Sequence, residues 1–260
     1  MSAPADRAIV VGNGAECLSI GDITVHFEGL AAVEGVSWTL RRDDVLGLIG
    51  PNGAGKTTIV NVISGFQHPA RGKVVLDGED ITDWQPHRRS RHGLVRTFQA
   101  VRLFRGMSVI DNLAVAGVGT GLARGAAERR AYEILTWMQF EHRAMDPADS
   151  LPYGEERRIG IARALTMAPR YIMLDEPAAG LGDVECDELM QLIAAIPRQF
   201  HCGVLLIEHN MRLIMGACHR IHVLDSGRTI AEGSPAEIRA DPAVVRAYLG
   251  TRSEQRRVRR

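Results

Sequence analysis

The chain has 260 residues, of which 45% are hydrophobic and 24% are charged, and its 31 basic residues balance 31 acidic ones. This size is sufficient for one α/β domain, alone or with a small inserted subdomain. The zero net charge gives no general reason to expect nucleic acid, and we predict no nucleic-acid partner. Because no run of about 18 apolar residues occurs, the sequence predicts no membrane-spanning helix.

The first part of the chain predicts strands. Residues 1–16 lack the apolar segment of a signal peptide, so we interpret them as an N-terminal extension of a cytoplasmic protein. Apolar and polar residues alternate over 17–27 and again over 36–40, and residues 73–78 have the pattern of a hairpin. We therefore expect an antiparallel β region. The cysteines form no C-x-x-C pair and are expected to be buried free thiols; they are Cys17, Cys186, Cys202 and Cys218.

A glycine-rich motif follows this region. Two of the 31 basic residues are lysines, and Lys56 lies in the run G-P-N-G-A-G-K-T-T over residues 50–58, which has the pattern of a phosphate-binding loop. An apolar run of strand length precedes the motif at 45–49, and a helical pattern follows it up to Gly65. The alternative is an ordinary glycine-rich turn between a strand and a helix.

In the P-loop interpretation, Lys56 reaches the β- and γ-phosphates of ATP, and Thr57 places its hydroxyl on Mg²⁺. Successive backbone amides bind the phosphates. The predicted ATP contacts in this loop are Asn52, Gly53, Ala54, Gly55, Lys56, Thr57 and Thr58.

The second half of the chain changes from helical to alternating patterns. From about 108 to 166 the pattern is helical, which predicts an inserted helical subdomain. Strand patterns return at 171–174, 204–207 and 220–224, separated by helical stretches, and this alternation predicts a parallel sheet. Capping signals at 234–237 and 241–242 predict two final helices. We divide the chain into an extension (1–16), a nucleotide-binding core (17–98 and 167–235), the helical subdomain (99–166), and C-terminal helices with a basic tail (236–260).

Two adjacent acids, Asp175 and Glu176, follow the strand predicted at 171–174. In a doubly wound sheet this strand end lies near the P-loop, so Asp175 is the candidate Mg²⁺ ligand, acting through water, and Glu176 is the candidate general base for the attacking water. This is the form of a Walker B motif. An acid pair at a strand end is otherwise often only the start of a turn or helix.

Two polar residues are candidates for sensing the γ-phosphate. His209 follows the strand at 204–207 and could donate a hydrogen bond to that phosphate, although a lone histidine there is usually structural. Gln99 ends a strand-like segment where the chain enters the helical insert. It could contact Mg²⁺ and the γ-phosphate while its backbone moves with the insert.

The order of these motifs resembles the ATP-binding-cassette (ABC) ATPases, from about residue 17 to residue 250. Residues 151–155 look like the family's signature motif, followed by its helix. The resemblance implies a P-loop NTPase with a RecA-like core, in which Phe27 stacks on adenine, although a core phenylalanine is an alternative. It also implies that two ATP molecules lie between two cassettes, with each signature contacting the partner's ATP through Leu151, Tyr153, Gly154 and Glu155.

More specifically, four segments resemble the LivG-type subunits of bacterial branched-chain amino-acid importers: 93–104, 174–181, 206–211 and 246–250. This resemblance implies an ATPase that powers uptake of branched-chain or other hydrophobic amino acids. The implied partners are a second cassette in a homodimer or heterodimer, two integral membrane permease subunits and, indirectly, a substrate-binding protein. The implied location is the cytoplasmic face of the cell membrane. Alternatives are an amide or urea importer, a lipid exporter, a soluble ATPase acting on DNA or ribosomes, and a non-hydrolysing regulatory subunit.

Three residues depart from the family pattern. Pro152 stands where the signature usually has serine, Glu155 where glutamine is common, and Gly182 where the D-loop has an acidic or amide residue. An acid near a phosphate is unfavourable unless it turns away. We hypothesise that hydrolysis survives because the catalytic candidates are intact, namely Lys56, Asp175, Glu176 and His209. A partner with a standard signature would compensate for weaker closure at this chain's signature.

Overall fold

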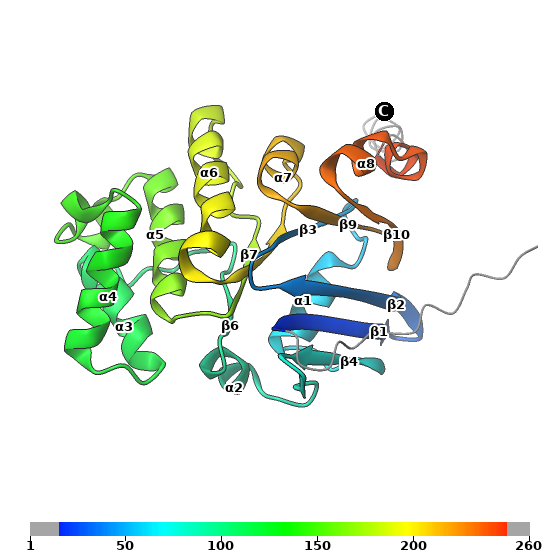
Figure 1. The fold of residues 1–260 in the computed structure, drawn as a ribbon, viewed down its shortest axis with the longest axis horizontal. Coiled ribbons are helices and arrows are strands. Elements are labelled where there is room, and N and C mark those ends of the chain that lie inside the picture. Colours follow the sequence, from blue (N-terminus) through cyan, green and yellow to red (C-terminus); the bar gives the residue numbers. More distant parts are fainter. Residues whose placement is uncertain (1–15, 249–260) are drawn as a thin grey trace, which may run out of the picture.

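A computed structural model describes residues 16–248. The predicted extension up to residue 15 and the basic tail from residue 249 lie outside the described residues. Within them, the strands form two β-sheets, with helices packed around them (Figure 1).

The smaller sheet is antiparallel, as predicted. Its order is β2-β1-β4-β5. Glu28 and Gly29 have φ angles of 48° and 85°, and these left-handed conformations make the tight turn between the first two strands. The strands are β1 (Cys17–Phe27), β2 (Leu30–Arg41), β4 (Arg71–Leu76) and β5 (Glu79–Asp80).

The larger sheet has the order β10-β9-β3-β8-β7-β6. The five strands from β9 to β6 are parallel, as the sequence predicts, whereas β10 pairs antiparallel with β9. The sequence analysis did not predict β10, which returns through a hairpin at Ser226 and Gly227. The strands are β3 (Val45–Ile49), β6 (Leu94–Arg96), β7 (Tyr171–Asp175), β8 (Gly203–Ile207), β9 (Arg220–Asp225) and β10 (Arg228–Gly233).

Helices cover both faces of the parallel sheet because its central strands are apolar on both sides. In β3, Leu46 and Leu48 belong to the core shared with α1 (Lys56–Ser64) and the antiparallel sheet, whereas Val45 and Ile49 belong to the core on the opposite face. That opposite face is covered by α6 (Asp183–Phe200) and α7 (Met211–Ala217). The remaining helices of the core are α2 (Pro86–Arg91) and α8 (Pro235–Ala240), and residues 242–248 are also helical, as predicted.

The segment between β6 and β7 is helical, and its helices lie together at one end of the molecule (Figure 1). Helix α5 packs on α3 and α4. The elements are α3 (Val109–Gly119), α4 (Arg124–Trp137), the short 3₁₀ helices η1 (Glu141–Arg143) and η2 (Ala148–Ser150), and α5 (Tyr153–Thr166).

A buried arginine joins α1 to α2. The guanidinium of Arg89 is 1% exposed and donates hydrogen bonds of 2.7 Å to the carbonyl oxygens of Val62 and Ile63, at the C-terminal end of α1. It also donates to Trp84 O and Thr82 O. Burial lowers the pKa of Arg89 to about 10, so the side chain remains protonated at neutral pH.

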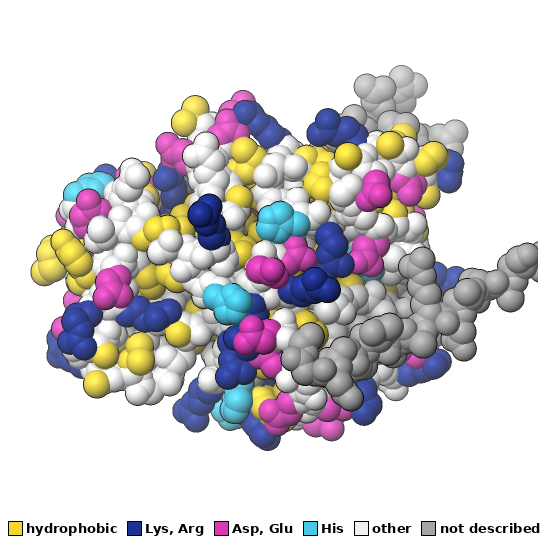
Figure 2. All heavy atoms as spheres, in the orientation of Figure 1, with side chains coloured by type: hydrophobic (Ala, Val, Ile, Leu, Met, Phe, Trp, Pro, Cys, Tyr) yellow, Lys and Arg dark blue, Asp and Glu magenta, His cyan; other side chains and the backbone are white. Residues whose placement is uncertain are grey.

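Basic and acidic side chains are interspersed over the face that Figure 2 shows, in keeping with the zero net charge. Among residues 16–248, none of the helices combines the length and the apolar character that crossing a bilayer requires. The four cysteines are buried and free, as predicted.

Candidate functional site

The P-loop connects β3 to α1 and depends on its glycines. Gly50 and Gly55 have φ angles of 154° and 101°. A Cβ atom on Gly50 would lie 2.1 Å from Leu224 O, whereas one on Gly53 would meet nothing within 4 Å. The loop is therefore packed against β9 on one side and has open space on the other, as a phosphate cradle requires.

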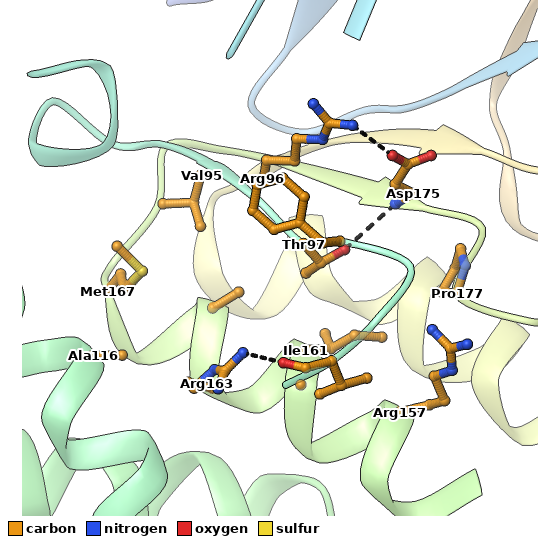
Figure 3. Close-up of a pocket in the computed structure, with 14 residues that line it drawn as sticks. Val95, Arg96, Thr97, Ala116, Arg157, Ile161, Arg163, Met167, Asp175 and Pro177 are labelled. Carbon is orange, nitrogen blue, oxygen red and sulfur yellow. Dashed lines mark hydrogen bonds and ion pairs between the residues drawn. The ribbon is translucent and has the colours of Figure 1, made fainter. Parts of the chain in front are cut away.

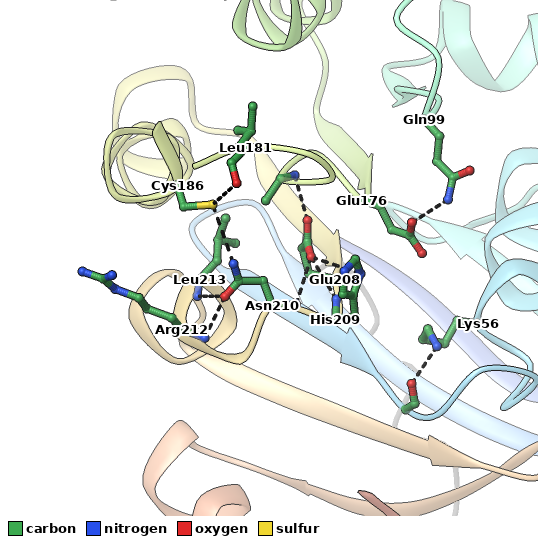
Figure 4. A network of polar contacts seen from close by, with 12 residues as sticks. Lys56, Gln99, Glu176, Leu181, Cys186, Glu208, His209, Asn210, Arg212 and Leu213 are labelled. Carbon is green, nitrogen blue, oxygen red and sulfur yellow. Dashed lines mark hydrogen bonds and ion pairs between the residues drawn. The ribbon is translucent and has the colours of Figure 1, made fainter. Parts of the chain in front are cut away.

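Lys56 begins α1, and its ammonium donates hydrogen bonds to Gly50 O at 2.7 Å and Pro51 O at 2.9 Å. Burial lowers the pKa of Lys56, and the negative charges of Glu176 and Asp175 oppose this effect. The two predicted acids are thus near enough to Lys56 to act on it electrostatically. Figure 4 shows Lys56 and Glu176 in one view.

Asp175 ends β7 and pairs with Arg96 at the end of the neighbouring strand β6. Arg96 Nη2 lies 2.8 Å from Asp175 Oδ2 (Figure 3). Arg96 Nη1 donates to Asn61 Oδ1 on α1 at 2.7 Å. The sequence analysis did not single out Arg96. The signal that could have identified Arg96 is its position, because it is a charged residue that ends an apolar strand pattern three positions before Gln99.

Glu176 and Gln99 lie together, although 77 positions separate them. Gln99 Nε2 donates to Glu176 Oε2 at 2.7 Å (Figure 4). Glu176 has a φ angle of 47°, a left-handed conformation that is costly for a residue with a Cβ atom. The structure therefore brings the candidate base and the candidate sensor into direct contact.

His209 and Phe27 have exposed side chains. His209 follows β8, and its side chain is 64% exposed beside the buried carboxylate of Glu208 (Figure 4). Phe27 ends β1 and is 49% exposed. Thr57 and Thr58 lie in the first turn of α1, and Asn52 and Ala54 lie in the loop before it.

The predicted signature lies at the N-terminal end of α5, and two of its side chains are engaged within the chain. The Tyr153 hydroxyl donates to Ala179 O at 3.0 Å. Glu155 turns toward Arg143, whose Nη2 donates to Glu155 Oε1 at 3.1 Å, so its carboxylate is not free. Pro152 is the N-cap residue and offers no side-chain hydrogen bond to the helix, and Leu151 immediately precedes it.

Glu185 joins the predicted signature to Gly182, in the predicted D-loop. It accepts a hydrogen bond from Gly182 N at 2.9 Å, at the start of α6. A Cβ atom on Gly154 would lie only 2.1 Å from Glu185 Oε1. A side chain at position 154 would therefore displace the Glu185 carboxylate from its place beside Gly182.

Two arginines of helix α5 donate hydrogen bonds to the backbone of residues 99–102. Arg157 donates to Gln99 O, and Arg163 donates to Val101 O and to Arg102 O at 3.0 Å. Between the two arginines, a Cβ atom on Gly160 would lie 2.6 Å from Val101 Cγ1. These contacts, which we call the α5 clasp (Arg157, Gly160 and Arg163), attach the backbone of Gln99 to the helical segment.

Two hollows flank the clasp. A cavity of about 180 Å³ lies between the end of β6, Asp175 and α5 (Figure 3). A larger groove of about 690 Å³ lies between residues 99–105 and 148–157, and the residues that line it include Gln99, Arg105 and Tyr153.

Comparison with known proteins decides the family. Residues 33–179, more than half of the chain, match the family model described as ABC transporter, and residues 228–254 match that of the branched-chain amino acid ATP-binding cassette transporter. The chain belongs to the ABC transporter family. The predicted family, the P-loop NTPase fold and the prediction of a transport-coupled ATPase subunit are thereby confirmed.

Several relatives match this cassette over 90% of its length. It is 44% identical to the high-affinity branched-chain amino acid transport ATP-binding protein LivG of Salmonella typhimurium, covering 97% of that protein. It is 42% identical to the corresponding protein BraF of Pseudomonas aeruginosa, also over 97%. It is 37% identical to the lipopolysaccharide export system ATP-binding protein LptB of Escherichia coli K12, again over 97%.

Among solved structures, the cassette is similar to an ATP-binding cassette of an ABC transporter in its ADP conformation. The TM-score is 0.82 and the identity 29%, and the match covers 90% of this chain and 99% of that one. A nucleotide-free cassette from an ABC transporter gives a TM-score of 0.80 at 30% identity, with 90% and 98% covered. Cassettes of this fold bind nucleotide, which accords with the predicted nucleotide-binding function.

Proposed function

We propose that this cassette hydrolyses ATP with Mg²⁺ and thereby powers uptake of branched-chain or other hydrophobic amino acids. The observation that carries the hydrolytic part is the placement of Glu176, whose carboxylate lies on Gln99 at 2.7 Å and within electrostatic reach of Lys56. The amino-acid part rests on the names of relatives such as LivG and BraF.

In this proposal the P-loop residues 52–58 hold the phosphates and Phe27 stacks on the adenine. Lys56 exchanges its carbonyl partners for the β- and γ-phosphate oxygens. Glu176 takes the proton of the attacking water, and His209 donates a hydrogen bond to the γ-phosphate.

The residues proposed to surround the phosphates fit Mg²⁺, because hydroxyl, carboxylate and amide oxygens are the donors that this ion prefers. Thr57, Asp175 and Gln99 would hold it. When bound, the ion would neutralise charge on the β- and γ-phosphates. Arg96 already holds Asp175 Oδ2, so the carboxylate is fixed in one orientation beforehand.

We further propose that a second cassette completes the site through its signature residues, and that this chain's Leu151, Tyr153, Gly154 and Glu155 contribute to the partner's ATP site. The hydroxyl of Tyr153 and the carboxylate of Glu155 are both engaged within the chain, and Pro152 supplies neither a hydroxyl nor an N–H. This favours a contribution through the backbone of α5, and it favours a heterodimer in which the partner carries a standard signature.

We propose that two membrane subunits dock at the groove of about 690 Å³ beside Gln99, at the cytoplasmic face of the membrane. A substrate-binding protein would deliver the amino acid to them. The α5 clasp would then carry their movement to the backbone of Gln99. In this scheme residues 17–98 and 167–235 act as the nucleotide-binding core, 99–166 as the moving subdomain, and 236–260 as the C-terminal part.

The test is the substitution Glu176→Gln, with Glu141→Gln at an exposed position of η1 as the matched control. We expect Glu176→Gln to bind ATP as the wild type does and to lose nearly all phosphate release, since the amide cannot accept the proton. Normal turnover by Glu176→Gln would remove this residue from the base role. Leucine, amide, urea and lipid transport by the assembly retrieved with a tag on this chain would identify the substrate.

A further inference from the structure

One buried carboxylate near the candidate site, that of Glu208, has no assigned role in the proposed hydrolysis. Glu208 lies between the end of β8 and His209 and is 1% exposed. Its Oε1 atom accepts a hydrogen bond from Ala178 N at 2.8 Å, and its Oε2 atom accepts from His209 N at 2.9 Å and Asn210 N at 3.1 Å (Figure 4). A buried carboxylate is costly unless it is hydrogen-bonded, and here three backbone amides satisfy it.

This carboxylate has no strong cationic partner. Within residues 16–248, the one group at ion-pair distance from Glu208 is His209 Nδ1, at 3.7 Å, on an exposed imidazole. Because no lysine or arginine in that part of the chain pairs with it, Glu208 does not serve as half of a buried salt bridge. The hydrogen bonds that it accepts come from backbone N–H groups of two loops.

The two loops are those that carry the candidate catalytic groups. Ala178 lies two residues after Glu176, and His209 follows Glu208 directly. A second link joins the same loops, because Glu176 N donates to Ile207 O at 2.9 Å. The Glu176 backbone is thus held at its own amide by Ile207, the last residue of β8, and two residues later, at Ala178, by Glu208.

Glu176 needs such restraint because its backbone is in the left-handed region, with a φ angle of 47°. A residue with a Cβ atom keeps this conformation only when its surroundings impose it. The bond from Ala178 N to Glu208 is part of what imposes it. The same carboxylate orients the backbone from which the His209 side chain projects.

We propose that Glu208 is a positioning residue for hydrolysis. It holds the loop that carries Glu176 and the loop that carries His209 at a fixed separation. It acts through these two residues and not on the phosphates, so it affects turnover and leaves ATP binding to the P-loop. The inference rests on the proposed hydrolysis at Glu176 and goes beyond it by assigning a residue that sets the geometry of that step.

The isosteric change Glu208→Gln tests this directly. A carboxamide has one oxygen and one NH₂ group, so it cannot accept from both sides. In one orientation Ala178 N loses its acceptor, and in the other His209 N and Asn210 N lose theirs. Glu208→Asp keeps the charge but is one methylene shorter, and it should retain one side of the link and intermediate turnover.

Steady-state hydrolysis, ATP binding and amide hydrogen exchange are measured on the full-length chain, alone and in the assembly retrieved with it. The matched control is Glu237→Gln, which alters a carboxylate that accepts from Ser234 N, at the start of α8. For Glu208→Gln we expect kcat to fall about 10- to 100-fold, KM and Kd for ATP to change by less than about twofold, and exchange at Ala178 to accelerate. The control should match the wild type.

Combination with His209→Ala separates positioning from a general loss of structure. If Glu208 acts through His209 and Glu176, the double variant loses less activity than the product of the two single losses. The inference is overturned if the wild type hydrolyses ATP and Glu208→Gln does so equally fast, if only KM rises, or if the two losses multiply. A wild-type chain that does not hydrolyse ATP would overturn the proposed function itself.

Discussion

The packing of the α5 clasp allows a quantitative prediction of how Gly160→Ala changes the free energy of unfolding. An ideal Cβ atom at Gly160 lies 2.6 Å from Val101 Cγ1, whereas ordinary contact begins at 3.4 Å, so Val101 has to move by about 0.8 Å. Valine is stiff at χ1. Arg157 donates to Gln99 O before Val101, and Arg163 donates to Val101 O and to Arg102 O, so the backbone that carries the Val101 side chain is held in place.

Two opposing effects determine the size of the change. Replacing glycine by alanine inside a helix gains about 1 kcal/mol of stability. Forcing an extra methyl group into a packed contact costs about 1–3 kcal/mol. We therefore expect Gly160→Ala to lower the free energy of unfolding by about 1 kcal/mol and to lower ATP turnover, because the displaced segment carries the backbone of Gln99.

The matched control is Gly125→Ala in α4, where the new Cβ atom would meet only Arg129 Nη1, at 3.7 Å. That change should leave stability equal or raise it by up to about 1 kcal/mol. Equilibrium urea unfolding measures both variants, and Val101→Ala in the Gly160→Ala background should recover part of the loss. The packing argument is wrong if Gly160→Ala stabilises as much as Gly125→Ala, or if Val101→Ala recovers nothing.

Two further predictions concern stability. Arg89→Met removes the donors to four carbonyl oxygens, of which those of Trp84, Val62 and Ile63 accept in buried hydrogen bonds. It should lower the free energy of unfolding in urea by about 3 kcal/mol; a loss below about 0.5 kcal/mol would contradict this role. Asp77 accepts hydrogen bonds from Arg42, Arg170 and Tyr171. Burial by itself would raise the pKa of Asp77, but these bonds outweigh it and hold that pKa below 3.8. The stabilisation is therefore present above about pH 4 and lost as the pH falls through the folded-state pKa. Asp77→Asn should cost about 2 kcal/mol at pH 7 and progressively less below pH 4, and a cost that is unchanged at pH 3 would refute the assignment.

The residues that the sequence analysis identified belong to continuous runs. The P-loop, the acid pair at 175–176 and the capping box at 234–237 each depend on neighbours within about nine positions, and a local pattern displays them completely. Strand β10 was not predicted from the sequence, because the turn at Ser226 and Gly227 was not recognised as a hairpin signal.

The sequence by itself determined the family, the phosphate-binding loop and the identity of the candidate base, because glycine spacing and strand periodicity are local properties of the chain. Only the tertiary structure decided that Arg96 holds Asp175, 79 positions away, and that Glu208 holds Ala178, 30 positions away. It also decided that arginines of α5 donate hydrogen bonds to the backbone of Gln99 and Val101. Such contacts depend on strand order and on the packing of helices on the sheet, which a single chain of residues does not display until it is folded.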